Sequence, residues 1–380
     1  MGYFVKQLFI FLLPLGLILV FPLVIIFLGR EYYSGSDAVR FQAQHPDAIV
    51  GMAYSRFYFD YKKRLISEKK PTVFSLGTSR TQEFREEFFI DSSRFVTASN
   101  GAETVDEMTT FIKELPRNNS TKLVIVALEP DIFRSSWSKE MPIIREPLLL
   151  PITLLRKWRS FYMDYFSGKF SLRGLWKNSW ETNNIGLRAI MNEDGFRKDG
   201  SFQWKEFVSP NESAIKENLK IAIDSEISGI KIKRNTSVNK EPLSLGSIAS
   251  LENFLNLCRK KNIQVIGFLP PVPPDILKEI MSVDDTYKKR TLQFPKVLGR
   301  IFSDNGFEYY DLSDVSTFGG TENEFADQVH GTDKLYLRMV IYMAERNKDI
   351  GSYVDLSKNR RLLESISGDF IRDYRVREEK

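Results

Sequence analysis

The sequence predicts an α/β fold in which helices cover a central parallel sheet. Short apolar runs at 72–76, 95–98 and 122–128 alternate with segments whose apolar residues recur at helical spacing, the clearest being 104–115. Parallel strands need a crossover between them, usually a helix, and are buried on both faces. Strand, helix, strand, helix, strand over the first section therefore indicates a parallel sheet between helices.

This alternation stops after residue 131 and resumes near residue 248. The later elements are a helix at 248–261, a strand at 263–269, a helix at 294–304, a strand at 307–312 and a helix at 334–346. Between the two sections we expect a mostly helical insertion, about 132–245, with possible helices at 154–166 and 214–228. Long excursions from a compact sheet usually shape a pocket or a partner surface, and a separate packing subdomain is the alternative.

The first 30 residues predict an uncleaved transmembrane signal anchor. Between Lys6 and Arg30 lie 23 uncharged residues, which as a helix can cross a hydrocarbon layer of roughly 30 Å. A cleaved signal peptide is the alternative, but the apolar stretch is longer than its usual core of about 7–15 residues. A polar connector at 31–70, the α/β domain at 71–350 and a charged tail at 351–380 complete the predicted organisation.

Composition restricts the possible partners and cofactors. The 54 basic residues are nearly matched by 49 acidic ones and are interspersed with them, so we expect no nucleic-acid partner. The single cysteine, Cys258, lies in an apolar helical segment and is expected to be a buried structural thiol. The sequence has no Cys/His cluster, phosphate-binding glycine loop or dinucleotide fingerprint, so no metal and no cofactor is predicted.

Ser79 is the first candidate for chemistry. It follows the apolar run at 72–76 in the turn Gly77-Thr78-Ser79-Arg80, which would place it at the carboxyl edge of the sheet. A serine hydroxyl needs a base to take its proton and donors to hold the oxyanion that forms, and the N–H of Ser79 near a helix start could be one donor. The alternative is that Ser79 merely caps the helix expected at 81–84.

An imidazole and an acid lie near the other end of the chain, three residues apart. The chain has two histidines, and His45 lies in a polar stretch just after the anchor, so His330 is the imidazole available to the α/β domain. Asp327 can orient the ring or hold its charge. Both residues fall in the loop between the last strand and the last long helix, where they can approach the same sheet edge as Ser79.

These segments together resemble the SGNH/GDSL hydrolase superfamily. The order of Gly77-x-Ser79, Asn100-Gly101 after the second strand and Asp327-x-x-His330 is similar to its motif order. The amino-terminal anchor and the proline-rich loop at 270–274 resemble its membrane-anchored cell-envelope branch, such as the DltD proteins of teichoic acid D-alanylation and the alginate O-acetylation proteins.

The resemblance implies roles for particular residues. Ser79 would be the nucleophile, His330 the base and Asp327 its partner, while the N–H of Gly101 would help to hold the oxyanion; Asn100 and Arg80 are further candidates for oxyanion or substrate binding. Hydrolases of the superfamily place an asparagine donor after the third strand, where this chain has Glu129. Losing one such donor typically costs about 100- to 1000-fold in rate, and we expect Glu129 either to point elsewhere or to bind substrate.

The expected function is therefore serine-dependent acyl transfer or ester hydrolysis on an envelope glycan or a lipid-linked polymer. The resemblance implies a single-pass protein of the cytoplasmic membrane, with its catalytic domain on the extracytoplasmic side, acting beside a multi-pass membrane acyltransferase. The alternatives are an inactive scaffold or glycan-binding protein, and a lipase-like esterase. Aromatic and basic residues of the insertion either stack on sugars or pack, namely Trp137, Trp158, Arg159, Trp176 and Trp180.

Overall fold

The computed structural model describes residues 2–55, 57–116, 119–133, 151–208, 212–233, 243–282, 285–366 and 368. The chain divides into two compact units. The first unit comprises Met1–Tyr61, Ile144–Lys198 and Phe202–Lys205, and the second comprises Lys62–Ile143, Asp199–Ser201 and Glu206–Lys380. These limits differ from the predicted ones, because the expected connector and the expected insertion are each shared between the two units.

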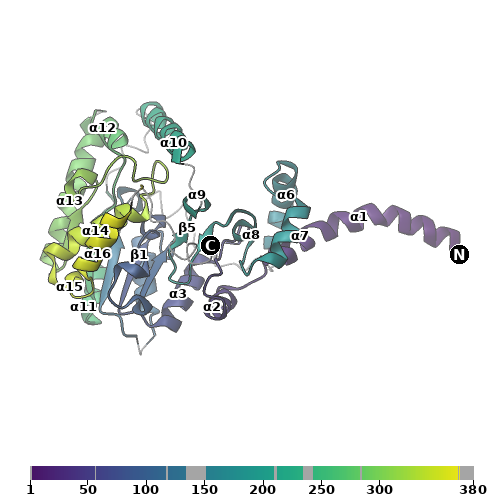
Figure 1. The fold of residues 1–380 in the computed structure, drawn as a ribbon, viewed down its shortest axis with the longest axis horizontal. Coiled ribbons are helices and arrows are strands. Elements are labelled where there is room, and N and C mark those ends of the chain that lie inside the picture. Colours follow the sequence, from purple (N-terminus) through teal and green to yellow (C-terminus); the bar gives the residue numbers. More distant parts are fainter. Residues whose placement is uncertain are drawn as a thin grey trace. The chain divides into compact units, whose positions relative to one another are not determined.

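The second unit is built on the predicted parallel sheet (Figure 1). Its strands are β1 (Val73–Gly77), β2 (Phe95–Ser99), β3 (Leu123–Ala127), β6 (Gln264–Leu269) and β7 (Glu308–Asp311). All four pairings are parallel, in the order β2-β1-β3-β6-β7. The α/β class and the parallel sheet are therefore confirmed.

Helices and short 3-10 turns connect these strands. The α-helices outside the first unit, or only partly in it, are α3 (Tyr58–Lys69), α4 (Val105–Lys113), α9 (Lys205–Val208), α10 (Glu212–Lys233), α11 (Leu245–Lys260), α12 (Pro274–Ser282), α13 (Asp285–Asp304), α14 (Asp333–Arg346), α15 (Lys348–Gly351) and α16 (Leu356–Ser365). The 3-10 helices are η1 (Ser79–Thr81), η2 (Glu86–Phe88), η3 (Ser92–Arg94), η4 (Pro130–Phe133) and η6 (Val315–Phe318).

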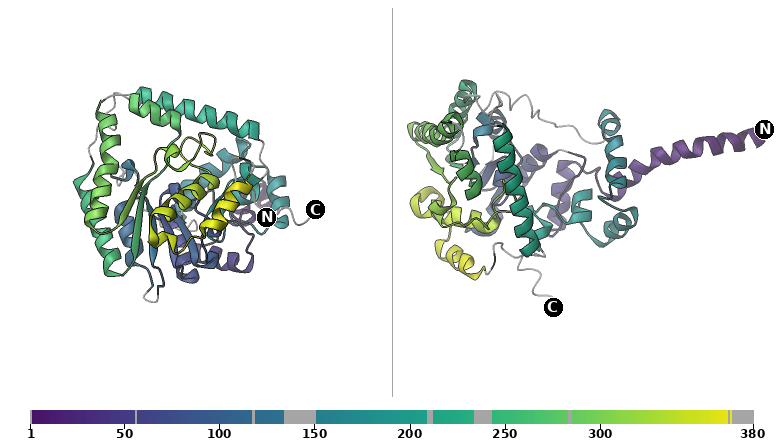
Figure 2. Two further views of the ribbon diagram at one scale, coloured as in Figure 1. Left: turned by 60° about the vertical axis from the view of Figure 1, so that its left-hand side comes forward. Right: turned by 90° about the horizontal axis from the view of Figure 1, so that it is seen from above.

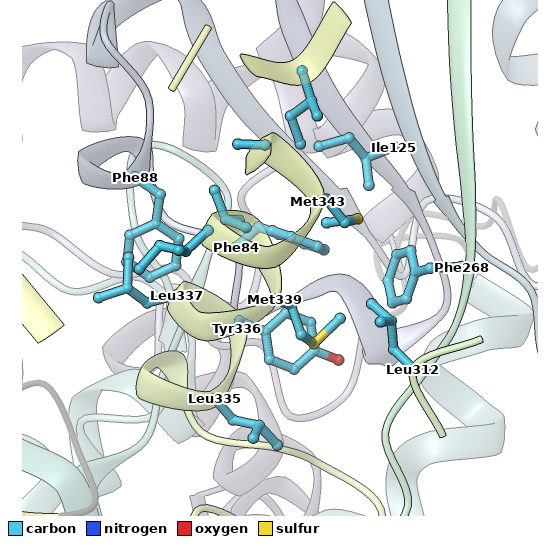
Figure 3. Packing of buried hydrophobic residues seen from close by; sticks show 14 of the residues in the cluster. Phe84, Phe88, Ile125, Phe268, Leu312, Leu335, Tyr336, Leu337, Met339 and Met343 are labelled. Carbon is cyan, nitrogen blue, oxygen red and sulfur yellow. The ribbon is translucent and has the colours of Figure 1, made fainter. Parts of the chain in front are cut away.

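Helices flank both faces of this sheet (Figures 1 and 2). Side chains alternate between the faces along each strand, so neighbouring residues meet different helices. Ile125 packs in one cluster with the buried face of α14, where Figure 3 shows Met343 beside it and Met339 further along the helix. Phe74 points to the opposite face and contacts Phe111 of α4, with ring centroids 6.1 Å apart. Burial on both faces explains why β1 and β3 are mostly apolar along their length.

A short segment from elsewhere in the chain covers the edge strand β2. The N–H of Thr97 donates to the carbonyl of Asp199 at 2.8 Å. Lys62, which is fully buried, donates to the carbonyls of Gly200 at 2.5 Å and Thr97 at 3.3 Å and to Ser99 Oγ at 3.3 Å. Burial lowers the pKa of Lys62, and the nearby Asp199 charge opposes that shift. These bonds cover the edge and hold the end of β2 in place.

The first unit is mainly helical. Its elements are α1 (Gly2–Leu28), α2 (Gly35–Gln44), α6 (Pro151–Phe166), α7 (Leu172–Glu181), α8 (Leu187–Asn192) and the antiparallel pair β4 (Gly195–Phe196) and β5 (Phe202–Gln203). The end of α1 packs into an apolar cluster through Ile25, Ile26 and Leu28. Beyond it, the buried Glu31 accepts the backbone N–H groups of Ala53, Tyr54 and Leu187 at 2.7–3.2 Å. Burial raises its pKa to about 7 despite these bonds.

No single helix in the described part of the chain is both long and apolar enough to cross a membrane. The two halves of α1, Tyr3–Leu13 and Ile18–Leu28, are long and apolar enough when taken together, but they are bent by 53° relative to each other. Pro14 and Gly16 lie in the break between the halves, and proline kinks a helix by removing a backbone donor.

One local prediction was wrong, because the helix expected at 81–84 is only the single turn η1. Within the predicted connector the chain forms two helices, α2 and α3. Of the expected tail at 351–380, residues 356–365 form α16, while 367 and 369–380 lie outside the described residues.

Candidate active site

Ser79 lies directly after β1, as expected. Strand β1 is buried throughout and ends at Gly77, whose φ of +156° is one that residues with a side chain rarely adopt. Thr78 then caps the 3-10 helix η1, with its Oγ1 accepting the N–H of Arg80 at 3.2 Å. The turn thus places Ser79 half-buried at the carboxyl edge of the sheet.

The structure brings Ser79 together with Asp327 and His330, although His330 lies 251 residues further along the chain. His330 Nε2 lies 2.9 Å from Ser79 Oγ, and His330 Nδ1 lies 2.8 Å from Asp327 Oδ2. Both distances are those of hydrogen bonds. The predicted convergence of a hydroxyl, an imidazole and a carboxylate at one edge is therefore confirmed. With a proton on Nδ1, the Nε2 lone pair faces the serine hydroxyl, which is the arrangement needed to remove its proton.

Asp327 holds both the ring and the backbone of its own loop. Its Oδ1 accepts the backbone N–H groups of Val329 and His330, each at 2.7 Å, while Oδ2 faces the ring. Burial alone would raise the pKa of Asp327, but the hydrogen bonds from His330 and Val329 outweigh it and hold the pKa below its usual range. Asp327 is therefore a charged partner for an imidazolium that forms during proton transfer.

Further bonds close this loop on itself. The N–H of Ala326 donates to the carbonyl of His330 at 2.7 Å, and the N–H of Thr332 donates to the carbonyl of Glu324 at 2.9 Å. The buried Glu324 is held in turn by the guanidinium of Arg338 on α14, with Nε 3.0 Å from Oε2. The helix thus fixes the loop, and the loop fixes the imidazole.

Of the predicted oxyanion donors, the N–H of Ser79 and the amide of Asn100 are available in the structure, and the N–H of Gly101 is not. As the first residue of η1, Ser79 has an N–H without an acceptor inside that helix, so it is free to face substrate. The prediction for Gly101 was wrong: its N–H donates to the carbonyl of Ala98 at 3.1 Å and closes the turn after β2. Asn100 sits in that turn at a φ of +55°, half-exposed, and among the described residues its side-chain amide has no hydrogen-bond partner.

Glu129 does not point away from the site, which was one of the two expectations for it. It follows β3, accepts the Thr78 hydroxyl at 2.5 Å, and interacts electrostatically with Arg80 and His330. Burial raises the pKa of Glu129, against the lowering effects of Arg80 and Thr78. A carboxyl group therefore stands where the resemblance expects an amide.

Arg80 has a positioning contact that the sequence did not reveal. Its Nη2 donates to the carbonyl of Pro271 in the proline-rich loop, and its own carbonyl accepts the hydroxyl of the buried Tyr336 on α14. The Nε of Arg80 is buried and has no partner among the described residues. Tyr336 was missed because it looks like any apolar position of an amphipathic helix, and no signal distinguishes it.

Strand order explains why the site lies here. By sequence the order is second, first, third, so the chain leaves β1 toward one side and β3 toward the other. Open α/β sheets bind ligands at such a reversal, outside the carboxyl ends of the strands. Ser79 follows β1 and Glu129 follows β3, so the two residues flank that point.

The remaining predicted residues lie elsewhere. Cys258 is buried, as expected, and burial raises its pKa to about 12. Trp158 is half-buried, whereas Arg159, Trp176 and Trp180 are exposed; Trp137 lies outside the described residues. Within the described ranges, no cluster of three or more His, Cys, Asp or Glu side chains could hold a metal ion.

Comparison with known proteins adds no relative. The chain matches no protein-family model, and no curated protein matches it in sequence.

Asp327→Asn separates the two tasks of Asp327. The amide oxygen can still accept the N–H groups of Val329 and His330, so the melting temperature should change little. The amide nitrogen can only donate to Nδ1, which forces the other tautomer, and serine reactivity should fall roughly 10⁴-fold. Thermal unfolding and the rate of fluorophosphonate labelling measure the two effects. Equal labelling rates in variant and wild type would contradict this role.

Glu129→Gln should stabilise the protein at neutral pH. Because the pKa of Glu129 is raised on folding, the folded state binds its proton more tightly than the unfolded chain does. The free energy of unfolding therefore falls as pH rises from the usual value of 4.5 through the raised one. The variant should melt higher than wild type near pH 8, and the difference should shrink near pH 4. Glu252→Gln, on an exposed position of α11, is the control and should show no such trend. A pH-independent difference would count against the raised pKa.

Proposed function

We propose that this protein is a membrane-anchored serine acyl-transfer enzyme or esterase. The observation that supports it most directly is the hydrogen-bonded chain from Ser79 Oγ through the His330 ring to Asp327. A serine that only caps a helix does not require an imidazole hydrogen-bonded to its hydroxyl, and a histidine that only stabilises a loop does not require a serine hydroxyl. Their alignment at the reversal point of the sheet favours nucleophilic catalysis.

The reaction follows the order of the hydrogen bonds. Ser79 Oγ attacks the carbonyl carbon of an acyl ester or thioester while His330 Nε2 takes the hydroxyl proton. The tetrahedral oxyanion is held by the N–H of Ser79 and by the side-chain amide of Asn100. When the bond to the leaving group breaks, His330 returns the proton to it and the acyl group stays on Ser79. A sugar hydroxyl or water then attacks the acyl-serine, with His330 again as base.

Glu129 argues against fast hydrolysis in this scheme. A carboxyl group beside the site, in place of an amide donor, gives the oxyanion weaker support, by about 100- to 1000-fold in rate for a lost donor. Transfer and hydrolysis both pass through such an oxyanion, so the choice between them depends on which acceptor the site binds.

The biological setting in this proposal comes from the resemblance to membrane-anchored SGNH-like proteins of the cell envelope. It includes α1 as a single span in the cytoplasmic membrane, an extracytoplasmic catalytic unit, a glycan or lipid-linked polymer as acceptor, and a multi-pass acyltransferase as partner. The three-layer SGNH-like architecture belongs to the same proposal, and the strand order and helix placement are consistent with it.

The inactive scaffold, or glycan-binding protein, is less well supported. Binding alone needs no imidazole between a serine and an aspartate. The loop that carries His330 is fixed by the hydrogen bonds of Asp327, Ala326 and Thr332 described above. A lipase-like esterase shares the same residues, so acceptor specificity has to distinguish it from a transferase.

Fluorophosphonate labelling of the full chain tests the proposal. Ser79 Oγ should displace fluoride and form a covalent phosphonate ester, so wild type should label and Ser79→Ala should not. His330→Gln should label at least about 10⁴-fold more slowly, because the base is lost. Labelling is measured by mass spectrometry of the modified peptide.

Ser93→Ala is the matched control. The Ser93 hydroxyl also bonds a carboxylate, Asp91, at 2.6 Å, but it has no imidazole and is exposed. This variant should label like wild type. If wild type labels no more than Ser79→Ala, Ser79 is not a nucleophile, and the inactive scaffold is the interpretation that remains.

A further inference from the structure

Helices α6 and α7 of the first unit expose large apolar side chains. Met163 and Phe166 are 56% and 79% exposed on α6, and Trp176 and Trp180 are 59% and 69% exposed on α7. The members of each pair are three or four residues apart, so each pair lies on one side of its helix. Exposed aromatic residues concentrated in this way usually mark a binding surface.

Helix α6 contacts α1 at Ile18 and Phe21. The Tyr162 hydroxyl of α6 donates to the carbonyl of Ile18, and its ring stacks on Phe21 with centroids 4.9 Å apart. From Pro22 onward several α1 side chains, such as Ile25 and Ile26, are buried within the first unit. Residues 3–20 of α1 lie before this packed part, and they measure about 27 Å along the helix, which bends by 53° within them.

That length nearly equals the hydrocarbon layer of roughly 30 Å. If residues 3–20 fill it, the level of Ile18 and Phe21 is the membrane–water interface, and α6 lies at that level. Tyrosine and tryptophan are enriched at this depth, where an apolar ring and a polar group are both satisfied. At this depth the exposed side chains of α6 and α7 then add apolar surface beside the short apolar segment of α1.

The charge of this region fits an anionic lipid surface. Residues 151–181 contain six basic and two acidic residues. Lys169 and Lys177 are 68% and 69% exposed, and Arg159 and Arg173 are also exposed. Basic residues near the apolar face of an interfacial helix bind anionic headgroups while the rings enter the acyl boundary.

We propose that α6 and α7 form a second membrane contact, in which Met163, Phe166, Trp176 and Trp180 insert into the lipid interface beside α1. This inference rests on the membrane anchor of the proposed function. It gives α1 a partner in the bilayer and fixes the first unit against the membrane surface.

Tryptophan quenching by brominated lipids tests this contact. The full chain is reconstituted in vesicles of phosphatidylcholine and phosphatidylglycerol, with bromine placed either near the headgroup or near the end of the acyl chain. Shallow bromine should quench wild-type fluorescence more than deep bromine. The double variant Trp176→Phe/Trp180→Phe keeps the apolar rings but removes the two reporters on α7, so its quenching should fall well below that of wild type, with Trp158 of α6 accounting for part of what remains. Trp204→Phe is the control and should keep the wild-type response.

Each other outcome overturns the inference. Equal quenching of the double variant and wild type, in chains that float with the vesicles, would show that α6 and α7 stay out of the lipid and would point to a protein partner on this surface. If the chains do not float with the vesicles, both the membrane anchor and this second membrane contact are contradicted. Fluorophosphonate labelling of Ser79 in the same sample reports on the catalytic proposal separately.

Discussion

The hydrogen bond between Ser79 Oγ and His330 Nε2 is the interaction on which the functional account depends, and Asp327 makes it possible. One carboxylate oxygen holds the ring while the other holds the backbone N–H of the same histidine and of its neighbour. Ring orientation and loop shape are therefore set by a single residue. Because the carboxylate is held in its charged form, the imidazole keeps a counter-charge whether or not it carries the extra proton.

The sheet supplies the other half of this geometry. Parallel strands end at one edge, and Ser79 and Glu129 approach the late loop at the reversal between β1 and β3. Helix α14 fixes that loop through Arg338 and Glu324 and fixes the Ser79 turn through Tyr336. The two parts of the site thus share one support, the helix whose apolar side packs on Ile125 and Phe268 (Figure 3).

The fold class and the three central residues could be predicted from the sequence because their signals are local. Apolar runs mark the strands, and the scarcity of histidine singles out His330. Gly101 could not be judged in this way, because whether its N–H closes a turn depends on the exact shape of residues 98–101. The contacts of Glu129 and Arg80 with Thr78 and Pro271 join residues about 50 and 190 positions apart, and no sequence spacing encodes them. The two-unit division was missed because the first unit joins residues 1–61 with residues 144–198, which are far apart along the chain.

A crystal structure of the fluorophosphonate-treated protein tests the central claim most directly. The account predicts phosphorus bonded to Ser79 Oγ, His330 Nε2 within hydrogen-bond reach of the adduct, and Nδ1 still on Asp327. The phosphonyl oxygen would also mark the oxyanion position, facing the N–H of Ser79. A phosphonate on another serine, or an adduct with the His330 ring turned away from it, would contradict the account.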